Sequence, residues 1–162
     1  MEVDSLYQVG DNIVYPMQGV GVIQSMEEKE ILGKKEQYFI IVFPVNDMQL
    51  MIPESKISTS GVRFVADSPA MDNVLTIFKN GERDTSLSWK QRYKTNMDKM
   101  KTGNLQDGAE VVRDLMLVNK EKALNPSEKQ MLEKARKFLV SELQFIKGIS
   151  NNQAAELLNT AL

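Results

Sequence analysis

The fold is decided by residues 62–78, which read VRFVADSPAMDNVLTIF. The first four of these residues are apolar and of strand type apart from Arg63, and they predict a short last strand. Ser68 followed by Pro69 then has the pattern of a helix N-cap with proline in the first turn. Beyond it the apolar residues recur at helical spacing, at Met71, Val74, Leu75 and Phe78. The chain changes here from strands to helices, which predicts an α+β protein.

Upstream of this stretch the pattern is that of short strands. Five runs rich in β-branched and aromatic residues alternate with turn residues, at 13–15, 19–23, 37–43, 48–52 and 62–65. Gly19 and Gly21 in the second run suggest a bulge or a bend. Five short strands cannot bury both faces of a flat sheet. We therefore expect a small closed β-barrel of the Tudor or SH3 type over residues 1–66.

Downstream, residues 67–162 predict a compact all-helical domain of about five helices with brief connections. The predicted helix starts are, in chain order, Ser68, Trp89, Asn104, Asn125 and Ser150. The fourth and fifth starts have the spacing of a capping box, in which a side chain three residues on closes the first turn. Glycines at positions 81, 103 and 148 predict the ends of three helices.

The composition excludes several classes of function. The 162 residues include no Cys and no His, so disulfides, a cysteine nucleophile, a Ser-His-Asp relay and the usual zinc sites are ruled out. The longest apolar run, residues 39–45, is too short to span a membrane, and the start has no signal-peptide pattern. We expect a soluble, cytoplasmic protein that is not an enzyme and uses no metal or cofactor.

Charge is divided unevenly along the chain. Residues 1–80 hold 6 basic and 11 acidic residues, whereas residues 81–162 hold 14 basic and 11 acidic ones. This difference suggests two parts with different partners. The acidic part suits a protein partner, and a pI near 5.3 is wrong for a chain that must find nucleic acid unaided.

Three weaker signals have ordinary structural explanations. The charged runs 27–30 and 34–36 flank a hairpin turn predicted at Leu32-Gly33-Lys34, and they fit a solvated hairpin better than an acid–base pair. The run Gly19-Val20-Gly21 lacks the rest of a nucleotide-binding motif. Four rings could form a cage for a methylated cation, although such rings more often fill a barrel core: Tyr7, Tyr15, Tyr38 and Phe39.

The most informative segment for function is residues 86–96, SLSWKQRYKTN. It contains the only Trp of the chain, Trp89, at a predicted helix start and close to Lys90, Arg92 and Lys94. One interpretation makes Trp89 an ordinary core residue with solvated charges on the other face. The other makes it an aromatic wedge for the DNA minor groove, flanked by phosphate contacts. Lys129 fits the second interpretation, because the first turn of a helix favours a phosphate.

These motifs together resemble the CarD/CdnL family of bacterial RNA polymerase-binding transcription regulators. The resemblance runs from Tyr7 to Leu162, and its matching segments are 9–16, 52–54, 89–94, 110–115 and 124–136. It implies an N-terminal Tudor-like domain that binds the β subunit of RNA polymerase through a sheet edge. It also implies a helical domain that touches promoter DNA at the upstream edge of the transcription bubble.

The resemblance also assigns roles to individual positions. The residue that matches Trp89 inserts into the minor groove and stabilises the open promoter complex. The positions expected to contact DNA are Trp89, Lys90, Arg92, Lys94 and Lys129, and those expected to contact RNA polymerase are Lys29, Ile31 and Met51. Gln91 and Met51 stand where some family members have Arg, so a contact is altered at each.

The sequence therefore predicts a transcription regulator of low sequence specificity that is held on RNA polymerase and stabilises open promoter complexes. The alternative is a protein–protein adaptor without direct DNA contact, in which Trp89 is core. We expect a monomer, and a domain-swapped dimer is possible if the polar residues 82–88 act as a hinge.

Overall fold

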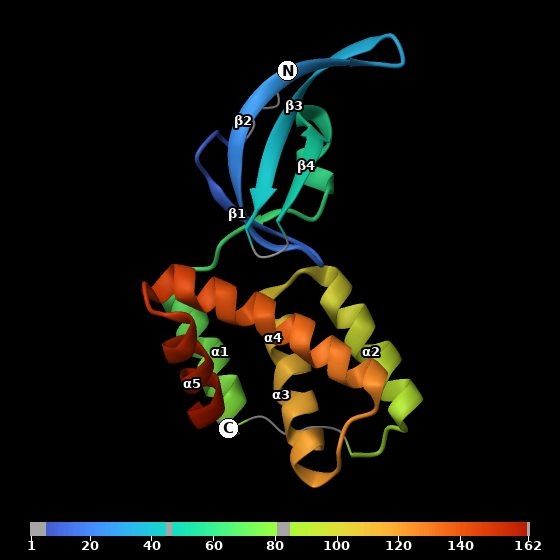
Figure 1. Cartoon of the computed structure of the whole chain (residues 1–162), viewed down its shortest axis with the longest axis vertical. Coiled ribbons are helices and arrows are strands. Elements are labelled where there is room, and N and C mark those ends of the chain that lie inside the picture. Colours follow the sequence, from blue (N-terminus) through green and yellow to red (C-terminus); the bar gives the residue numbers. More distant parts are fainter. Residues whose placement is uncertain (1–5, 45–46, 81–84, 162) are drawn as a thin grey trace. The chain divides into compact units, whose positions relative to one another are not determined.

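A computed structural model describes residues 6–44, 47–80 and 85–161 (Figure 1). The chain forms two compact units that divide between Val65 and Ala66. The first unit is a five-stranded antiparallel sheet with a 3-10 helix, and the second is helical. The predicted α+β class, with strands followed by about five helices, is confirmed.

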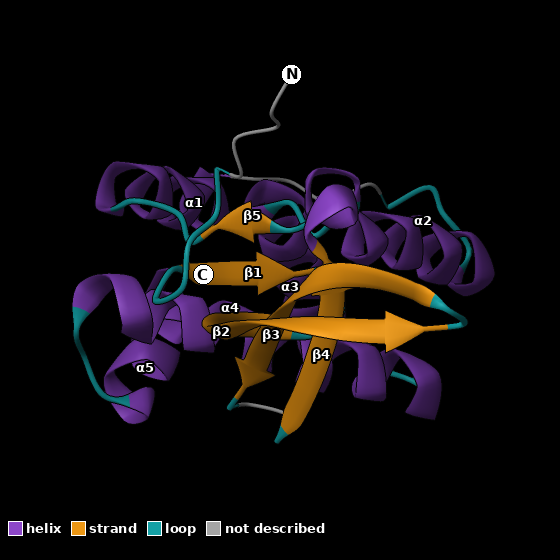
Figure 2. Cartoon of the chain, turned by 90° about the horizontal axis from the view of Figure 1, so that it is seen from above, coloured by secondary structure: helices purple, strands orange, loops and turns teal. Residues whose placement is uncertain are grey.

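The N-terminal unit contains one sheet in the order β4-β3-β2-β1-β5 (Figure 2). Its elements are β1 (Asn12–Tyr15), β2 (Gly19–Ile31), β3 (Lys34–Phe43), β4 (Met48–Pro53), η1 (Glu54–Thr59) and β5 (Arg63–Phe64). All the pairings are antiparallel. Strands β4 and β5 stand at the two ends of this order, and η1 lies between them in the chain.

Side chains that alternate along the strands form the core of this unit. Phe39, Ile41 and Phe43 of β3 are fully buried, and the strand register places Ile52 of β4 opposite Phe39. Ile13 and Ile23 complete the same core. The alternation of apolar residues along the strands therefore predicts which face of the sheet is buried.

The rings proposed for a cation cage have structural roles instead. Phe39 is fully buried in the core, and Tyr7 is buried with its hydroxyl donating to the Val62 carbonyl at 3.0 Å. The Tyr15 ring packs edge-on to Phe43, with 6.1 Å between the ring centroids. Tyr38 is buried as well, and Tyr15 is partly buried against the core.

The β2–β3 hairpin turns where the sequence predicted. Strand β2 continues through the charged run to Ile31 and β3 begins at Lys34, and polar side chains lie on both faces of this part of the hairpin. The expected bulge lies between Ile23 and Ser25, where the register of β2 against β3 shifts, and not at the glycines. Gly21 is required for a different reason. A Cβ on Gly21 would lie 2.7 Å from the Phe43 ring, so only glycine fits there.

The tip of this hairpin combines an exposed apolar side chain with an unusual backbone. Leu32 has φ of 53° and Gly33 has φ of 78°, so both residues occupy the left-handed region. This region is uncommon for residues other than Gly, Asn and Asp. The Leu32 side chain is nevertheless fully exposed, so it gains no buried area that offsets its backbone.

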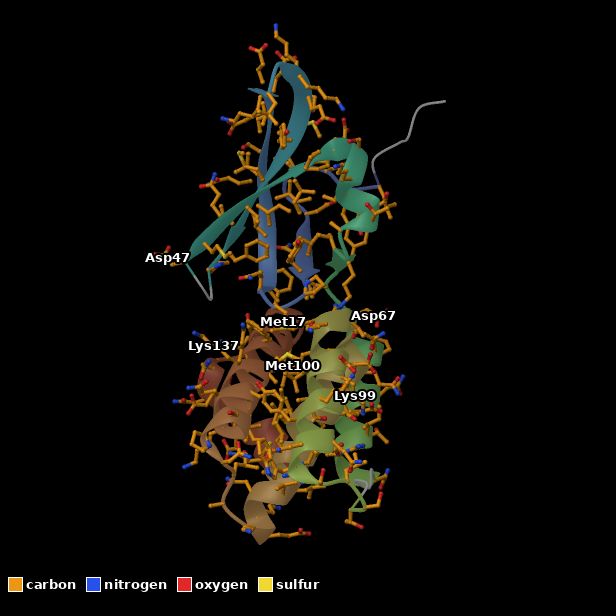
Figure 3. All side chains as sticks on the ribbon, turned by 90° about the vertical axis from the view of Figure 1, so that its right-hand side faces the viewer. Met17, Asp47, Asp67, Lys99, Met100 and Lys137 are labelled. Carbon is orange, nitrogen blue, oxygen red and sulfur yellow. The ribbon has the colours of Figure 1, made fainter. Side chains whose placement is uncertain are left out.

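The helical unit consists of five α-helices within the residues that the structure describes. They are α1 (Ser68–Asn80), α2 (Trp89–Thr102), α3 (Leu105–Glu121), α4 (Pro126–Lys147) and α5 (Asn151–Ala161). Helix α3 packs against α1, α2 and α4, and α5 packs against α1 and α4. The core includes Val111, Leu115 and Leu143, and Met100 of α2, labelled in Figure 3, is also buried.

The helix starts follow their capping residues closely. Asn104 and Asn125 cap α3 and α4 as predicted, and Ser150 and Gln153 form the expected reciprocal bonds at α5. The prediction for α1 is wrong by one residue.

At α1 the cap is Asp67 rather than Ser68. The Asp67 carboxylate accepts from the Ala70 N–H at 2.9 Å, and its carbonyl accepts from the Met71 N–H. The Ser68 hydroxyl accepts instead from Lys147 of α4 at 3.1 Å. Gly81, the expected stop of α1, and part of the expected hinge lie outside the described residues.

Among the described helices, none combines the length and the apolar character that crossing a bilayer requires.

Candidate nucleic-acid interface

Trp89 is the first residue of α2 and is held at the surface by the cap of that helix. The Ser88 hydroxyl accepts from the Gln91 N–H at 3.3 Å, and the Gln91 side chain accepts from the Ser88 N–H at 3.0 Å. The Trp89 side chain is 48% exposed. It is therefore exposed, and the interpretation of Trp89 as an ordinary core residue is wrong.

Gln91 has a role that the sequence analysis did not assign to it. It was noted as a lost basic position, yet it closes the capping box that fixes the first turn of α2. The signal was present in the spacing, since Ser88 and Gln91 are three residues apart. A glutamine at this position orders the backbone beside Trp89.

Lys90 lies next to the exposed indole. Its Nζ is 5.9 Å from the centroid of the Trp89 ring, which is within the range of a cation–π contact. Lys90 is exposed. Trp89 and Lys90 thus present an aromatic face and a positive charge on the same turn.

Arg92 is engaged inside the protein. Its Nε donates to Glu128 Oε2 at 2.7 Å and its Nη2 donates to Glu128 Oε1 at 2.8 Å. Glu128 is 1% exposed. Hydrogen bonds from Arg92 to Glu128 raise the pKa of the guanidinium, although its burial acts in the opposite direction. The guanidinium therefore forms an ion pair with Glu128, whereas the sequence predicted that it contacts a phosphate.

Lys94 and Lys129 are the other two predicted contacts, and both are exposed. The Lys94 ammonium lies 3.2 Å from the Asp98 carboxylate in an exposed pair one turn apart. Such a pair is worth at most about 1 kcal/mol, so a phosphate can readily replace Asp98 as the partner. Lys129 is in the first turn of α4 and directly follows Glu128.

The Arg92–Glu128 pair connects the parts of the site. It joins the first turns of α2 and α4, which carry Trp89 and Lys129 respectively, across 36 residues of sequence. Asn125, the cap of α4, also donates to Glu128 Oε1, at 3.1 Å. Sequence reasoning missed this role of Glu128 and Asn125, because it saw them only as the start of a helix.

The residues predicted to contact RNA polymerase share one face of the sheet. Side chains alternate along β2, so Lys29 and Ile31 point to the same side as Ser25. The register sets Ser25 opposite Ile40, and Ile40 opposite Met51 of β4. This face is opposite to the core face that carries Phe39 and Ile52.

Ile31 and Met51 are 42% and 44% exposed. The Lys29 ammonium lies 3.2 Å from the Glu27 carboxylate. Hydrogen bonds from Lys29 and Ser25 lower the pKa of Glu27. In the described residues β2 is flanked by β1 only at its start, so its later part has a neighbour on one side, β3.

Comparisons with known proteins match both units. The family model "CarD-like/TRCF RID domain" matches residues 7–66, and the family model "CarD, C-terminal domain" matches residues 73–159. The chain is 56% identical over 148 residues to "Putative transcription factor YdeB" of Bacillus subtilis (strain 168), which covers 91% of this chain and 97% of that protein.

A comparison with solved structures matches part of the chain. The solution NMR structure of the 72-residue N-terminal domain of Myxococcus xanthus CarD is 32% identical and covers 39% of this chain and 84% of that one, with a TM-score of 0.32.

Proposed function

The chain belongs to the CarD family and is a transcription regulator, and on that premise we propose that it stabilises the open promoter complex while held on RNA polymerase. In this proposal the sheet unit binds the β subunit. The helical unit contacts promoter DNA at the upstream edge of the bubble, where Trp89 inserts into the minor groove.

The observation that carries the proposal is the exposed Trp89 on an ordered helix start. A half-exposed Trp keeps apolar area in contact with water, and Trp is enriched among the residues that dominate binding interfaces. The capping box orders the backbone that carries the ring, so no backbone entropy has to be lost in this turn when the ring inserts between bases. A wedge of this kind acts on distorted DNA rather than on a particular base sequence.

The charges beside Trp89 favour a tethered DNA contact. With Arg92 engaged by Glu128, the exposed cations at the site are Lys90, Lys94 and Lys129. Three phosphate contacts correspond to a salt slope of roughly −3, which is too weak for free binding at physiological salt. A second attachment on RNA polymerase would hold the helical unit near the DNA at an effective concentration on the order of millimolar.

The sheet unit offers a surface for that attachment. Lys29, Ile31 and Met51 lie on one face and combine exposed apolar area with charge. The later part of β2 and strand β4 both present edges to which an extended segment of the β subunit can add. We therefore assign this face and its edges to RNA polymerase.

The lifetime of the open complex tests the proposal. It is measured on a ribosomal-type promoter with the cognate RNA polymerase after a competitor challenge, with and without the protein. Wild type is expected to lengthen the lifetime, and Trp89→Ala to lose about 1–3 kcal/mol of that effect, as aromatic–base contacts usually do. This loss corresponds to a lifetime roughly 5- to 150-fold shorter.

Trp89→Phe is the matched variant, because it keeps an aromatic wedge and removes only the second ring. It is expected to retain part of the effect. A folded Trp89→Ala protein that prolongs the complex as well as wild type contradicts the wedge. The same result together with normal capture of the β subunit and no DNA footprint favours the adaptor function.

A further inference from the structure

The link between α2 and α4 is built from side chains alone. Glu128 accepts three hydrogen bonds, two from Arg92 and one from the Asn125 amide, at 2.7, 2.8 and 3.1 Å. The Asn125 side chain in turn accepts from the Glu128 N–H at 2.8 Å, which closes the first turn of α4. Both oxygens of a carboxylate that is 1% exposed are therefore used.

The geometry of the link fixes both distance and angle. A guanidinium forked on a carboxylate has two parallel bonds and holds its partner in one plane, which a single charge contact does not. Helices α2 and α4 both pack on α3. The fork therefore sets how the first turn of α2 lies relative to that of α4.

The alternative role, a phosphate contact, conflicts with this arrangement. To reach DNA, Arg92 would have to leave a buried carboxylate without its countercharge, which is strongly unfavourable. With the fork intact, the charge of the guanidinium is balanced by Glu128 and contributes little to attraction of a phosphate. Lys94, one half-turn further along α2, has only an exposed partner and no such restriction.

We propose that Arg92 is a positioning residue: through Glu128 and Asn125 it holds Trp89 of α2 and Lys129 of α4 at the spacing at which both meet the DNA together. This inference rests on the proposed function. It assigns part of the effect on the open complex to a buried ion pair that does not itself contact DNA.

Glu128→Gln separates the two roles by the sign of its effect. The change removes a negative charge close to the DNA and frees Arg92, so a phosphate-contact role predicts a longer open-complex lifetime. A positioning role predicts a shorter lifetime, by about 10-fold if the loss is as large as for partners that orient metal ligands. Lys101→Gln, in the last turn of α2, is the control and is expected to leave the lifetime unchanged.

Arg92→Lys keeps the charge and loses the fork, so it tests the geometry directly. It is expected to shorten the lifetime while leaving the salt dependence of the effect unchanged. A phosphate contact predicts an almost unchanged lifetime instead, since a lysine keeps the charge and serves a phosphate nearly as well. The double variant with Glu128→Gln is expected to cost no more than either change alone, because the two residues act as one unit.

A second measurement does not depend on DNA. Trp89 is the only Trp of the chain, so the fluorescence anisotropy and acrylamide quenching of the free protein report on the first turn of α2. A looser turn in Arg92→Lys and Glu128→Gln, with an unchanged far-UV spectrum, supports positioning. Unchanged anisotropy and quenching in both variants overturns it, even if the lifetimes fall.

The outcomes of the two proposals are distinct. If Trp89→Ala leaves the lifetime unchanged, the proposed function fails. If Trp89→Ala shortens the lifetime and Glu128→Gln lengthens it, the proposed function stands and positioning by Arg92 is wrong.

Discussion

The two units place their candidate functional residues by different means. In the sheet unit, Lys29, Ile31 and Met51 share a face because backbone register puts them there. In the helical unit, the first turns of α2 and α4 are joined by side chains of Arg92 and Glu128. A register survives the loss of any one side chain, whereas a side-chain link does not. We therefore expect the helical site to be the more sensitive to single substitutions.

The largest expected difference comes from breaking one ion pair in the helical unit. Arg92→Ala leaves the Glu128 carboxylate buried and unpaired, so it is expected to lower the free energy of unfolding by about 3–5 kcal/mol. Urea unfolding followed by Trp89 fluorescence measures this change. Lys94→Ala is the control, since its partner Asp98 is exposed, and it should cost no more than about 0.5 kcal/mol. Equal effects of the two changes would contradict the comparison.

The same substitution should have opposite signs in the two units. Gly21→Ala places a Cβ 2.7 Å from the Phe43 ring, and it is expected to destabilise the sheet unit by about 1–3 kcal/mol. Gly108→Ala lies in the helix α3 with no atom within 4 Å of the added Cβ, so it should stabilise by about 0.5–1 kcal/mol. Thermal unfolding followed by circular dichroism measures both. A destabilised Gly108→Ala would show that α3 is not free to take a larger residue there.

A gain of the same size as that of Gly108→Ala is expected at the tip of the β2–β3 hairpin. Leu32→Asn replaces a fully exposed residue in the left-handed region by one that tolerates that backbone, so it should stabilise the sheet unit by roughly 0.5–1 kcal/mol. Thermal unfolding of the two proteins provides the measurement, and Lys35→Asn in the adjacent strand is a control that should give no gain. A Leu32→Asn protein that is less stable than wild type would mean that the exposed side chain contributes to folding.

The smallest expected effect is a dependence on acid. Burial raises the pKa of Glu110, but hydrogen bonds from Lys99 and Gln106 and the charges of Lys99 and Arg113 outweigh it, so the pKa lies below its ordinary value. The stability that this carboxylate contributes is therefore fully present above its unfolded pKa and is lost as the pH falls through the lowered folded value.

Lys99→Gln tests this contribution, since the Lys99 ammonium lies 3.1 Å from Glu110. Below about pH 4, where unfolded Glu titrates, the melting temperatures of wild type and Lys99→Gln should converge. At pH 6 the wild type should be slightly more stable. A difference that stays constant from pH 6 to pH 3 would place its origin outside the ion pair.

Most of the fold follows from local patterns in the sequence. Trp89, Asn104 and Asn125 lie at helix boundaries because their side chains or neighbours complete the first turn. The charged part of β2 has no apolar alternation, so its extent followed from the turn predicted at Leu32-Gly33-Lys34 rather than from its own pattern. The cap of α1 was misplaced because Asp67 and Ser68 are both good caps, and the Ser68 hydroxyl is bonded to Lys147.

The candidate site was less predictable than the fold. The exposed position of Trp89 could be proposed, since it stands at a helix start beside cations. The pairing of Arg92 with Glu128 could not, because nothing local connects residues 36 positions apart. A buried acid in the first turn of a helix resembles an ordinary capping residue until its partner is known.

The later part of β2 has a consequence for self-association. Beyond Ile23 the strand carries Glu27, Glu28, Lys29 and Glu30, and its backbone has a neighbour on one side only among the described residues. An exposed strand edge is a common route to aggregation, because any second strand can pair with it. Three of these four side chains are acidic, so a second copy of the strand would add like charge along the edge, whereas a strand of positive charge would meet opposite charge there.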